Sequence, residues 1–539
     1  MVKEIKTDYC IAGGGVPGLI LAKKLAASGK KILLLEQGPH ITESDRAELL
    51  RKSKETLNDF ADYNDNVDPV SVTPQTSAPF QEEDHIYDWV NYRLFGLGGT
   101  ALHFEAMMMR PTEDDFKVKS LYGFGRDWPI DYAELEPWLL KAEYEIGVAA
   151  NEDNPYAAFR SGSFPMPAHP FSYFDTDILA PALKKLNMTG HSCPRGTNSK
   201  PYDGRSACMS CRICKFCPSG ARFSPDRAIL PKLKTRENVT ILPDVSLRKL
   251  EIGSIGEKIE AAHLIHTKTE EKIVVRAENF ILSMGGVETP RMLMLSADGS
   301  AHKNGLGNMG GQLGKKFNDH LFPYITVDLG RHAGSRPGFE TMISDHLRVN
   351  LNRREEPGII ILGTPSMDWF PVGNEAVAWS TRGDELSLAD VRESIPQMAT
   401  ISLMTELEGE GMLELDESTP DEFGAPVAKV IMKLTERDRH ANVIFSDLAS
   451  RLGNAMDAER ISEVSPDGFG LGYHPSGATA MASNPDEGVC DENLKVFGVD
   501  NLFVVSNSVF PHMGANPPTL TIAALAQRLA AHLEGESAL

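Results

Sequence analysis

The sequence contains no long hydrophobic run and no excess of positive charge. No stretch of about 18 or more apolar residues occurs in its 539 residues, which argues against a membrane-spanning helix. Its 54 Lys and Arg are outnumbered by 75 Asp and Glu, so the formal net charge is -21. Nucleic acids and anionic lipid surfaces attract positively charged proteins, so neither is an expected partner.

We expect neither a disulfide framework nor a leader segment. Three of the seven cysteines, Cys10, Cys193 and Cys490, are scattered singly, which is typical of a protein that folds in a reducing compartment. The first eight residues, MVKEIKTD, run directly into a buried-strand pattern, so we expect no signal peptide of its own.

The composition that remains is that of a globular enzyme. Apolar residues make up 41% of the chain, with 46 Gly and 34 Pro, as in ordinary α/β proteins. A chain of this length exceeds the size at which a single hydrophobic core keeps growing, so we expect two domains.

A glycine turn near the N-terminus predicts a dinucleotide site. Strand-like residues 8–12 lead into Gly13, Gly15 and Gly18, then a helical pattern and a second strand that ends at Glu36. This G-x-G-x-x-G spacing places a pyrophosphate at the helix N-terminus, and Glu36 is positioned to accept hydrogen bonds from ribose hydroxyls. The motif does not choose between FAD and NAD, and a turn that only packs helix against strand is the alternative.

The patterns in the rest of the chain predict that a second domain is inserted into the first. Residues 238–282 have the pattern of a β-meander, residues 150–205 that of an extended segment, and a helix is expected at about 436–458. We therefore expect an α/β fold. A Rossmann-like domain is built from discontinuous segments (1–325 and 465–539), and an inserted α+β substrate domain with an antiparallel sheet occupies 326–464.

Four cysteines lie two residues apart in one short loop (203–222) and end at a proline. They are Cys208, Cys211, Cys214 and Cys217. Thiolates at this spacing suit a compact iron–sulfur cluster, because zinc sites normally use two cysteine pairs separated by a dozen or more residues. Zinc and free redox thiols stay open as alternatives.

Several ordered motifs resemble those of one enzyme family. They are GGGVPG (13–18), GGT (98–100), SMGGVETPRMLMLS (283–296), GYHPSGATAM (472–481) and NPPTLT (516–521). Together they resemble the glucose–methanol–choline (GMC) oxidoreductases. The middle of the chain, from RDWPIDYAELEPW to CPSGA, is similar to the branch that holds the iron–sulfur flavin subunits of bacterial sugar dehydrogenases.

The resemblance implies FAD as the cofactor and an alcohol as the substrate. His474 matches the catalytic histidine of the family and Asn516 matches its partner. The chemistry supports this pairing, since alcohol oxidation needs a base for the hydroxyl proton while hydride leaves for flavin N5. We expect His474 to accept the proton and Asn516 to orient the oxygen, with His512 a neighbour and His320 structural.

The resemblance also implies the contacts to FAD. The helix that begins near Pro517 and Thr519 is expected to direct its positive end at the flavin. Val245 is expected to place its backbone against the adenine. The second glycine turn (Gly98, Gly99, Thr100) and His103 complete the set. Some relatives attach FAD covalently at this histidine, but the flanking residues here differ, so we expect a non-covalent contact.

The resulting hypothesis is an FAD dehydrogenase for a hydroxyl of a sugar or glycoside. Electrons would leave through an iron–sulfur cluster, [3Fe–4S] by resemblance with [4Fe–4S] open, to a cytochrome or other external acceptor. A small accessory subunit is the implied partner. The protein would then be cytoplasmic, or carried to the periplasmic face of the inner membrane by that subunit. Two alternatives are an O2-dependent oxidase with a structural cysteine loop, and a non-catalytic flavin and iron–sulfur electron carrier.

Overall fold

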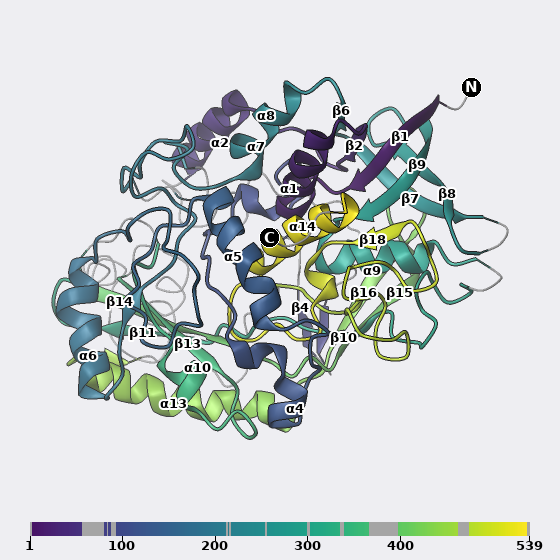
Figure 1. Cartoon of the computed structure of the whole chain (residues 1–539). Coiled ribbons are helices and arrows are strands. Elements are labelled where there is room, and N and C mark those ends of the chain that lie inside the picture. Colours follow the sequence, from purple (N-terminus) through teal and green to yellow (C-terminus); the bar gives the residue numbers. More distant parts are fainter. Residues whose placement is uncertain are drawn as a thin grey trace.

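A computed structural model describes residues 3–56, 80–82, 85–87, 93–211, 214, 217–253, 256–298, 302–334, 339–365, 397–461 and 474–535. Within these residues the strands form three sheets, of seven, six and five strands. Figure 1 shows the first at the N-terminal side of the molecule and the second on the opposite side, above a long helix.

The seven-stranded sheet has the order β6-β2-β1-β9-β8-β7, with β18 also paired to β9. Its strands are β1 (Lys3–Ala12), β2 (Ile32–Leu35), β6 (Val239–Leu242), β7 (Val245–Ile252), β8 (Ile259–His266), β9 (Lys272–Leu282) and β18 (Leu502–Val504). The pairings β6-β2-β1-β9-β18 are parallel. Of the meander predicted at 238–282, the β7-β8-β9 part is confirmed, whereas β6 pairs in parallel with β2 instead. All four residues of β2 are buried, as expected for a strand covered on both faces.

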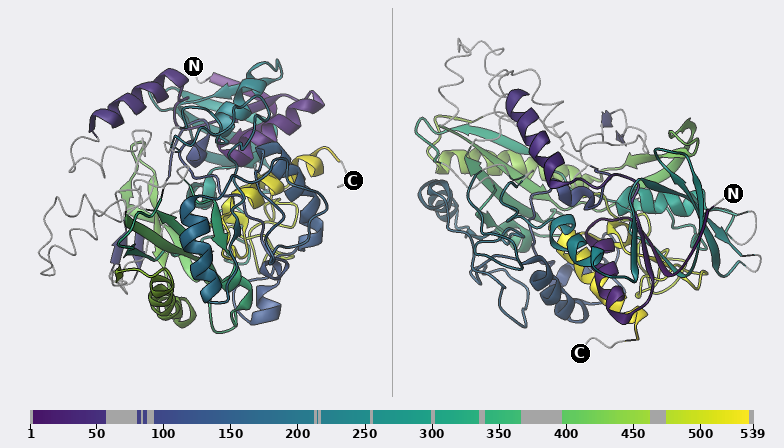
Figure 2. Two further views of the ribbon diagram at one scale, coloured as in Figure 1. Left: turned by 90° about the vertical axis from the view of Figure 1, so that its left-hand side faces the viewer. Right: turned by 90° about the horizontal axis from the view of Figure 1, so that it is seen from above.

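Helices from both ends of the chain cover this sheet. Helix α1 (Val16–Leu25) packs against α14 (Thr519–Leu533), and α14 also packs against α5 (Tyr132–Ile146). The purple N-terminal and yellow C-terminal helices lie together in each view (Figure 1 and Figure 2). Because α14 is enclosed by two helices, it is apolar nearly all round. The Rossmann-like FAD domain fold predicted from discontinuous segments is thereby confirmed.

The six-stranded sheet is antiparallel in the order β17-β11-β14-β13-β12-β5. Its strands are β17 (Arg460–Ile461), β11 (Tyr324–Asp328), β14 (Met398–Thr405), β13 (Ile359–Pro365), β12 (Met342–Ser344) and β5 (His191–Ser192). Helix α13 (Glu436–Ala455) begins with a capping box between Thr435 and Asp438 and buries Phe445 and Leu452 in the core of this sheet. The helix predicted at 436–458 is confirmed.

The five-stranded sheet has the order β10-β15-β16-β3-β4. Its strands are β10 (Lys315–Phe317), β15 (Gly411–Pro420), β16 (Pro426–Met432), β3 (Phe80–Glu82) and β4 (His85–Tyr87). Helix α9 (Gly285–Leu295) packs against β15 and β16. The boundary predicted after residue 325 falls within β11, and residue 464 lies outside the described part, so the division into two domains stays a prediction.

The segment 150–205 is not simply extended, contrary to the sequence-based expectation. A π-helical turn, η4 (Phe174–Leu179), continues into α6 (Ala180–Lys185). Phe174, Ile178, Leu179 and Leu183 recur at helical spacing and are buried against the six-stranded sheet, which stabilises a helix despite the proline at its start.

Shorter helices complete the described chain. They are η1 (Ala26–Ser28), α2 (Glu43–Thr56), η2 (Gly99–Leu102), η3 (Glu113–Phe116), α4 (Val118–Tyr122), α7 (Pro225–Ala228), α8 (Leu230–Lys234), α10 (His346–Asn350) and η6 (Asn507–Val509). Among the described helices, none combines the length and apolar character needed to cross a bilayer.

Candidate active site

The first glycine turn connects β1 to α1. Gly13 has φ +109°, and a Cβ there would lie 2.1 Å from the carbonyl oxygen of Ser283. A Cβ at Gly18 would lie 2.0 Å from the carbonyl oxygen of Gly13, so this glycine lets α1 approach the strand. At Gly15, in contrast, a Cβ would have only Pro17 within 4 Å. The N-terminus of α1 has no acidic side chain in its first turn and is open at Gly15, which suits a pyrophosphate.

The second glycine turn lies directly on the first. The Gly98 N–H donates to the carbonyl oxygen of Gly14 at 2.8 Å, and a Cβ at Gly99 would lie 3.0 Å from the Cα of Gly15. Thr100 follows within η2. Two glycine motifs that are more than eighty residues apart in the chain therefore form one backbone surface.

Glu36 is at the end of β2, where the sequence predicted it, and its carboxylate is held by backbone groups. The N–H groups of Gly14 and Gly38 donate to its two oxygens at 2.9 and 3.0 Å. Burial raises the pKa of Glu36 to about 7, although these hydrogen bonds act against the shift. The Val245 N–H donates to the Glu36 carbonyl at 2.9 Å, so Val245 lies beside Glu36 as an adenine contact requires.

Helix α14 presents its N-terminus at the other end of the site. Pro517 and Pro518 precede Thr519, and their fixed φ suits the first helical turn. The first turn has no acidic side chain, so the positive end of the helix dipole is not compensated there.

His474 is placed against His320 by a short backbone pairing. The segments around residues 318 and 476 form an antiparallel bridge, with N–H to carbonyl distances of 2.8 and 2.9 Å. Buried Asp319 reinforces it, because one of its oxygens accepts from the backbone N–H of both His320 and His474, at 2.7 and 2.8 Å. The two imidazoles then meet, with Nδ1 to Nδ1 at 2.8 Å.

The hydrogen bonds of this pair determine where its protons lie. Burial lowers the pKa of His320 to about 4, and burial together with His320 holds the pKa of His474 well below its usual range. Both rings are therefore neutral near pH 7. The Nε2 of His320 lies 2.8 Å from the carbonyl oxygen of Gly514, which only accepts, so Nε2 carries the single proton of that ring.

It follows that Nδ1 of His320 is an acceptor. The Nδ1–H of His474 donates to it, which leaves Nε2 of His474 with an exposed lone pair and no proton. A neutral histidine held in this tautomer is a general base at Nε2.

Asn516 is held by an arginine that the sequence did not identify. The Arg348 guanidinium donates to Asn516 Oδ1 at 3.2 Å and to Asp115 at 2.9 Å, and both Arg348 and Asn516 are buried. Because an arginine only donates, the oxygen of the amide must face it. The Nδ2 group donates to the carbonyl oxygen of Pro517 at 3.4 Å, and its second hydrogen is the part of Asn516 available to a substrate oxygen. Gly514, whose carbonyl binds His320, lies two residues before Asn516 and connects the two candidate catalytic side chains.

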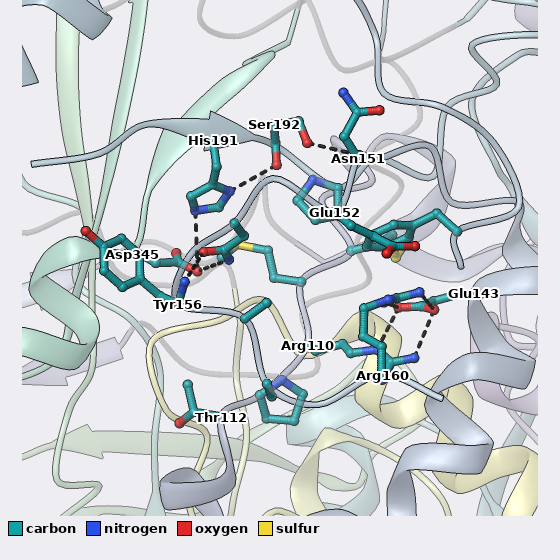
Figure 3. A pocket seen from close by; sticks show the side chains of 18 of the residues that line it. Arg110, Thr112, Glu143, Asn151, Glu152, Tyr156, Arg160, His191, Ser192 and Asp345 are labelled. Carbon is teal, nitrogen blue, oxygen red and sulfur yellow. Dashed lines mark hydrogen bonds and ion pairs between the residues drawn. The ribbon is translucent and has the colours of Figure 1, made fainter. Parts of the chain in front are cut away.

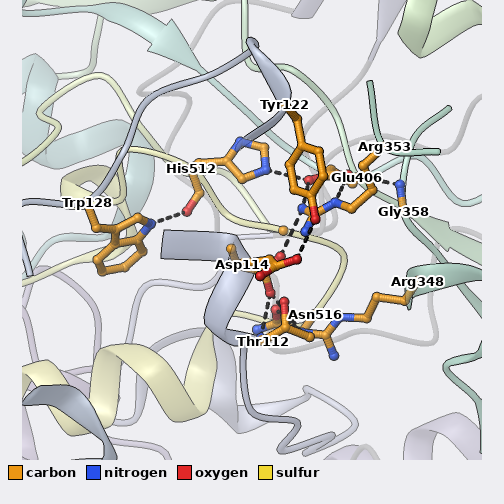
Figure 4. Close-up of polar contacts among 12 residues, drawn as sticks. Thr112, Asp114, Tyr122, Trp128, Arg348, Arg353, Gly358, Glu406, His512 and Asn516 are labelled. Atoms are coloured by element: carbon orange, nitrogen blue, oxygen red, sulfur yellow. Dashed lines mark hydrogen bonds and ion pairs between the residues drawn. The ribbon is translucent and has the colours of Figure 1, made fainter. Parts of the chain in front are cut away.

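A buried ionic network surrounds this arginine (Figure 4). Fully buried Glu406 accepts from Arg353, from Arg437 at 2.8 Å and from His512 Nε2 at 2.7 Å. Burial alone would raise the pKa of Glu406, but Arg353, His512 and Arg437 outweigh it and hold that pKa well below its usual range. His512 is therefore a member of this network. Its Nε2 is engaged by Glu406, so His512 is not the candidate base.

The cysteine loop docks on the segment that carries the second glycine turn. The Arg222 side chain donates to the carbonyl oxygens of residues 101, 102 and 104, which bracket His103. The Arg222 backbone N–H donates to Cys217 Sγ at 3.2 Å. One residue thus joins the buried end of the loop to η2.

The thiols themselves differ in exposure. Cys217 is buried, Cys208 and Cys214 are half-buried, and Cys211 is exposed. Burial, then Glu105, Cys208 and Cys217, raise the pKa of Cys214 to about 12, so three of the thiols are close enough to interact. In the described part of the chain, which leaves out residues 212, 213, 215 and 216, no three His, Cys, Asp or Glu side chains form a metal-binding group. The iron–sulfur assignment stays a prediction.

Sequence comparison identifies the family. Models of the GMC oxidoreductase family match residues 94–322 and 408–526, more than half of the chain. The chain belongs to the GMC oxidoreductases. The fructose dehydrogenase large subunit of Gluconobacter japonicus is 27% identical, with 98% of each chain covered. The 2-methyl-1,2-propanediol dehydrogenase of Mycolicibacterium austroafricanum is 24% identical, covering 97% of this chain and 94% of that protein.

Solved structures agree on the fold. Pyridoxine 4-oxidase from Mesorbium loti has a TM-score of 0.66 and 17% identity, and the match covers 98% of this chain and 100% of that one. The chain is thus an FAD-dependent oxidoreductase that acts on CH–OH groups, which resolves the choice of cofactor that the glycine motif left open.

The described residues fit FAD. Several buried hydroxyls lack a hydrogen-bond partner among the described residues, and two of them lie at the parts of the chain expected to bind FAD. These are Ser283 Oγ, beside Gly18, and Thr521 Oγ1, in the first turn of α14. Orphaned polar atoms at both ends of the site are expected where a polar cofactor completes the hydrogen bonding.

Proposed function

We propose that this GMC oxidoreductase is a dehydrogenase that oxidises a hydroxyl of a sugar or glycoside, with His474 as the base. The observation that carries the proposal is the chain of contacts from Gly514 through His320 to His474, since it leaves the lone pair at Nε2. The fructose dehydrogenase relative supports a sugar as substrate.

The chain contributes three actions to this reaction. Nε2 of His474 takes the hydroxyl proton, and its depressed pKa keeps it neutral for that purpose. Nδ2 of Asn516 donates to the substrate oxygen while Arg348 holds the amide oxygen. The N-terminus of α14 supplies positive potential for the anionic reduced flavin. Bound FAD, held by the glycine turns, supplies the hydride acceptor at N5.

The cysteine loop is the second part of the proposal. Four thiolates are the donor set of an iron–sulfur cluster, which supplies one-electron transfer when bound. The link through Arg222 to the segment around His103 supports a role in removing electrons from the flavin. By resemblance we infer a cluster held by cysteines of this loop (Cys208, Cys211, Cys214 and Cys217), three of them for [3Fe–4S] and all four for [4Fe–4S]. An accessory subunit and a cytochrome acceptor complete the proposal.

Anaerobic titration of the FAD-loaded enzyme with a sugar panel tests the first part. We expect at least one sugar or glycoside to bleach the flavin, and turnover to need an artificial or cytochrome acceptor. O2 consumption matching product formation would favour the oxidase alternative. A flavin that no sugar or simple alcohol reduces, while His474 and Asn516 are intact, would favour the electron carrier. Iron and sulfide analysis, with an electron paramagnetic resonance spectrum, tests the second part.

A further inference from the structure

A cavity of about 230 Å³, whose lining is more apolar than polar, is bounded on one side by Arg348. The described residues around it come from β5, the end of β12, α10 and the loops 108–112 and 151–164. Because one water occupies only about 30 Å³ of liquid, the cavity has room for a small polar molecule. Figure 3 shows its side chains, including His191, Asp345, Tyr156 and Arg160.

Two arginines that line the cavity, Arg110 and Arg160, are already neutralised by two carboxylates. Glu136 accepts from Arg110 at 2.8 Å. Glu143 accepts from Arg110 at 2.8 and 3.0 Å and from Arg160 at 2.7 and 2.8 Å, and Figure 3 shows these contacts grouped on one side. Their charge is thus not available to recruit an anion. A neutral ligand fits the remaining lining better than a charged one.

Three buried polar atoms on the other side lack a normal hydrogen bond within the described residues. They are Asp345 Oδ1, His191 Nε2 and Arg348 Nε, in side chains that are at least nine-tenths buried. Native proteins rarely leave such atoms unsatisfied, and each costs about 1–3 kcal/mol when it stays so. The cavity offers the space in which a ligand hydroxyl reaches them.

Asp345 is fixed in place by its neighbours, and its second oxygen is left without a donor. Its Oδ2 accepts from Asn154 at 2.9 Å and lies 3.5 Å from His191 Nε2. Burial alone would raise the pKa of Asp345, but His191 and Arg348 hold that pKa below its usual range. All of these contacts involve Oδ2 or the charge of the group, and Oδ1 has no hydrogen-bond partner among the described residues.

We propose that this cavity is a binding site for a neutral polyhydroxylated molecule, a sugar or sugar alcohol, separate from the catalytic pair. One ligand hydroxyl donates to Asp345 Oδ1, and the same or an adjacent hydroxyl accepts from Arg348 Nε. Tyr156 and Phe164 provide apolar walls for the C–H groups of the ligand. Since Arg348 also holds Asn516, occupancy of the site would reach the amide that orients the substrate.

Binding to the reduced holoenzyme tests the proposal without turnover. The FAD-loaded protein is reduced with dithionite under anaerobic conditions and dialysed to equilibrium against radiolabelled D-fructose, D-glucose or D-mannitol. We expect Asp345→Asn and His191→Phe each to weaken the binding of one sugar molecule per protein by about tenfold or more. The first substitution changes the buried carboxylate that accepts from the ligand, and the second removes the ring that holds this carboxylate in place. Glu152→Gln, at an exposed position on the rim of the same cavity, is the matched control and is expected to bind as the wild type does.

Thermal unfolding of each variant shows whether it has folded, and the two variants remove different side chains. Wild-type affinity for all three probes in both folded variants would overturn the proposal, as would the absence of binding to the wild-type protein. This result is independent of the proposed function, which fails instead when no sugar reduces the oxidised flavin. If the sugar also binds at the catalytic pair, two molecules bind per protein, and these substitutions leave the binding of that second molecule unchanged.

Discussion

Replacing His320 tests how the catalytic tautomer is set. His320→Leu removes the acceptor of the His474 Nδ1–H and the donor to the Gly514 carbonyl, both in a fully buried place. Leaving one buried group unsatisfied costs about 1–3 kcal/mol. A loss of this size in the free energy that orients His474 in the transition state slows reduction of the flavin roughly 5- to 150-fold. His320→Asn is the matched rescue, because its Oδ1 occupies the place of Nδ1 and still accepts from His474.

Stopped-flow reduction of the FAD-loaded enzyme under anaerobic conditions measures this rate, with FAD content and thermal midpoint as controls. We expect His320→Asn to recover most of the rate that His320→Leu loses. In the wild-type enzyme the rate should be constant above pH 6.5 and fall only at lower pH, because the base must be neutral and its pKa is held below that value. A His320→Leu enzyme that keeps the wild-type rate, or an equally slow His320→Asn enzyme that has folded, would refute the reasoning.

Three further outcomes follow from the same contacts. Gly15→Ala should fold normally but lose FAD, since the new Cβ meets only Pro17. Gly18→Ala should lose FAD and also lower the thermal midpoint, because its Cβ would lie 2.0 Å from the carbonyl oxygen of Gly13. Measurements of FAD content and thermal unfolding distinguish the two variants. Arg348→Met should free the Asn516 amide and slow flavin reduction about tenfold, with partial recovery in Arg348→Lys, as read by stopped-flow. Because the folded-state pKa of Glu36 is raised to about 7, the FAD-free protein should lose about 3 kcal/mol of stability as pH rises from 4.5 through 7; urea unfolding should show this loss absent in Glu36→Gln.

The parts of the site that depend on local sequence were predictable. The glycine turn is one β–turn–α unit, so its spacing alone predicted the strand, the turn and the start of the helix, and the place of Glu36 followed from the length of the unit. That FAD binds there stays a prediction. The start of α14 was predictable in the same way from its two prolines.

The contacts that orient the catalytic side chains were not predictable, because they join distant segments. His320 and His474 are 154 residues apart, and Arg348 and Asn516 are 168 apart. No periodicity links such positions. Asp319 is the one residue of this set that the sequence could have indicated. An aspartate directly before a candidate site histidine can accept a hydrogen bond from nearby backbone amides. Glu406 offered no such signal, because its role depends on two arginines and a histidine that only the fold brings to it.

The most direct test of the central claim is the anaerobic rate of flavin reduction in FAD-loaded His474→Ala, with the sugar that reduces the wild-type enzyme fastest. The account predicts a rate lower by about 10²- to 10⁴-fold at pH 7, with full FAD content and an unchanged thermal midpoint. Reduction of the flavin at the wild-type rate in this variant would contradict it.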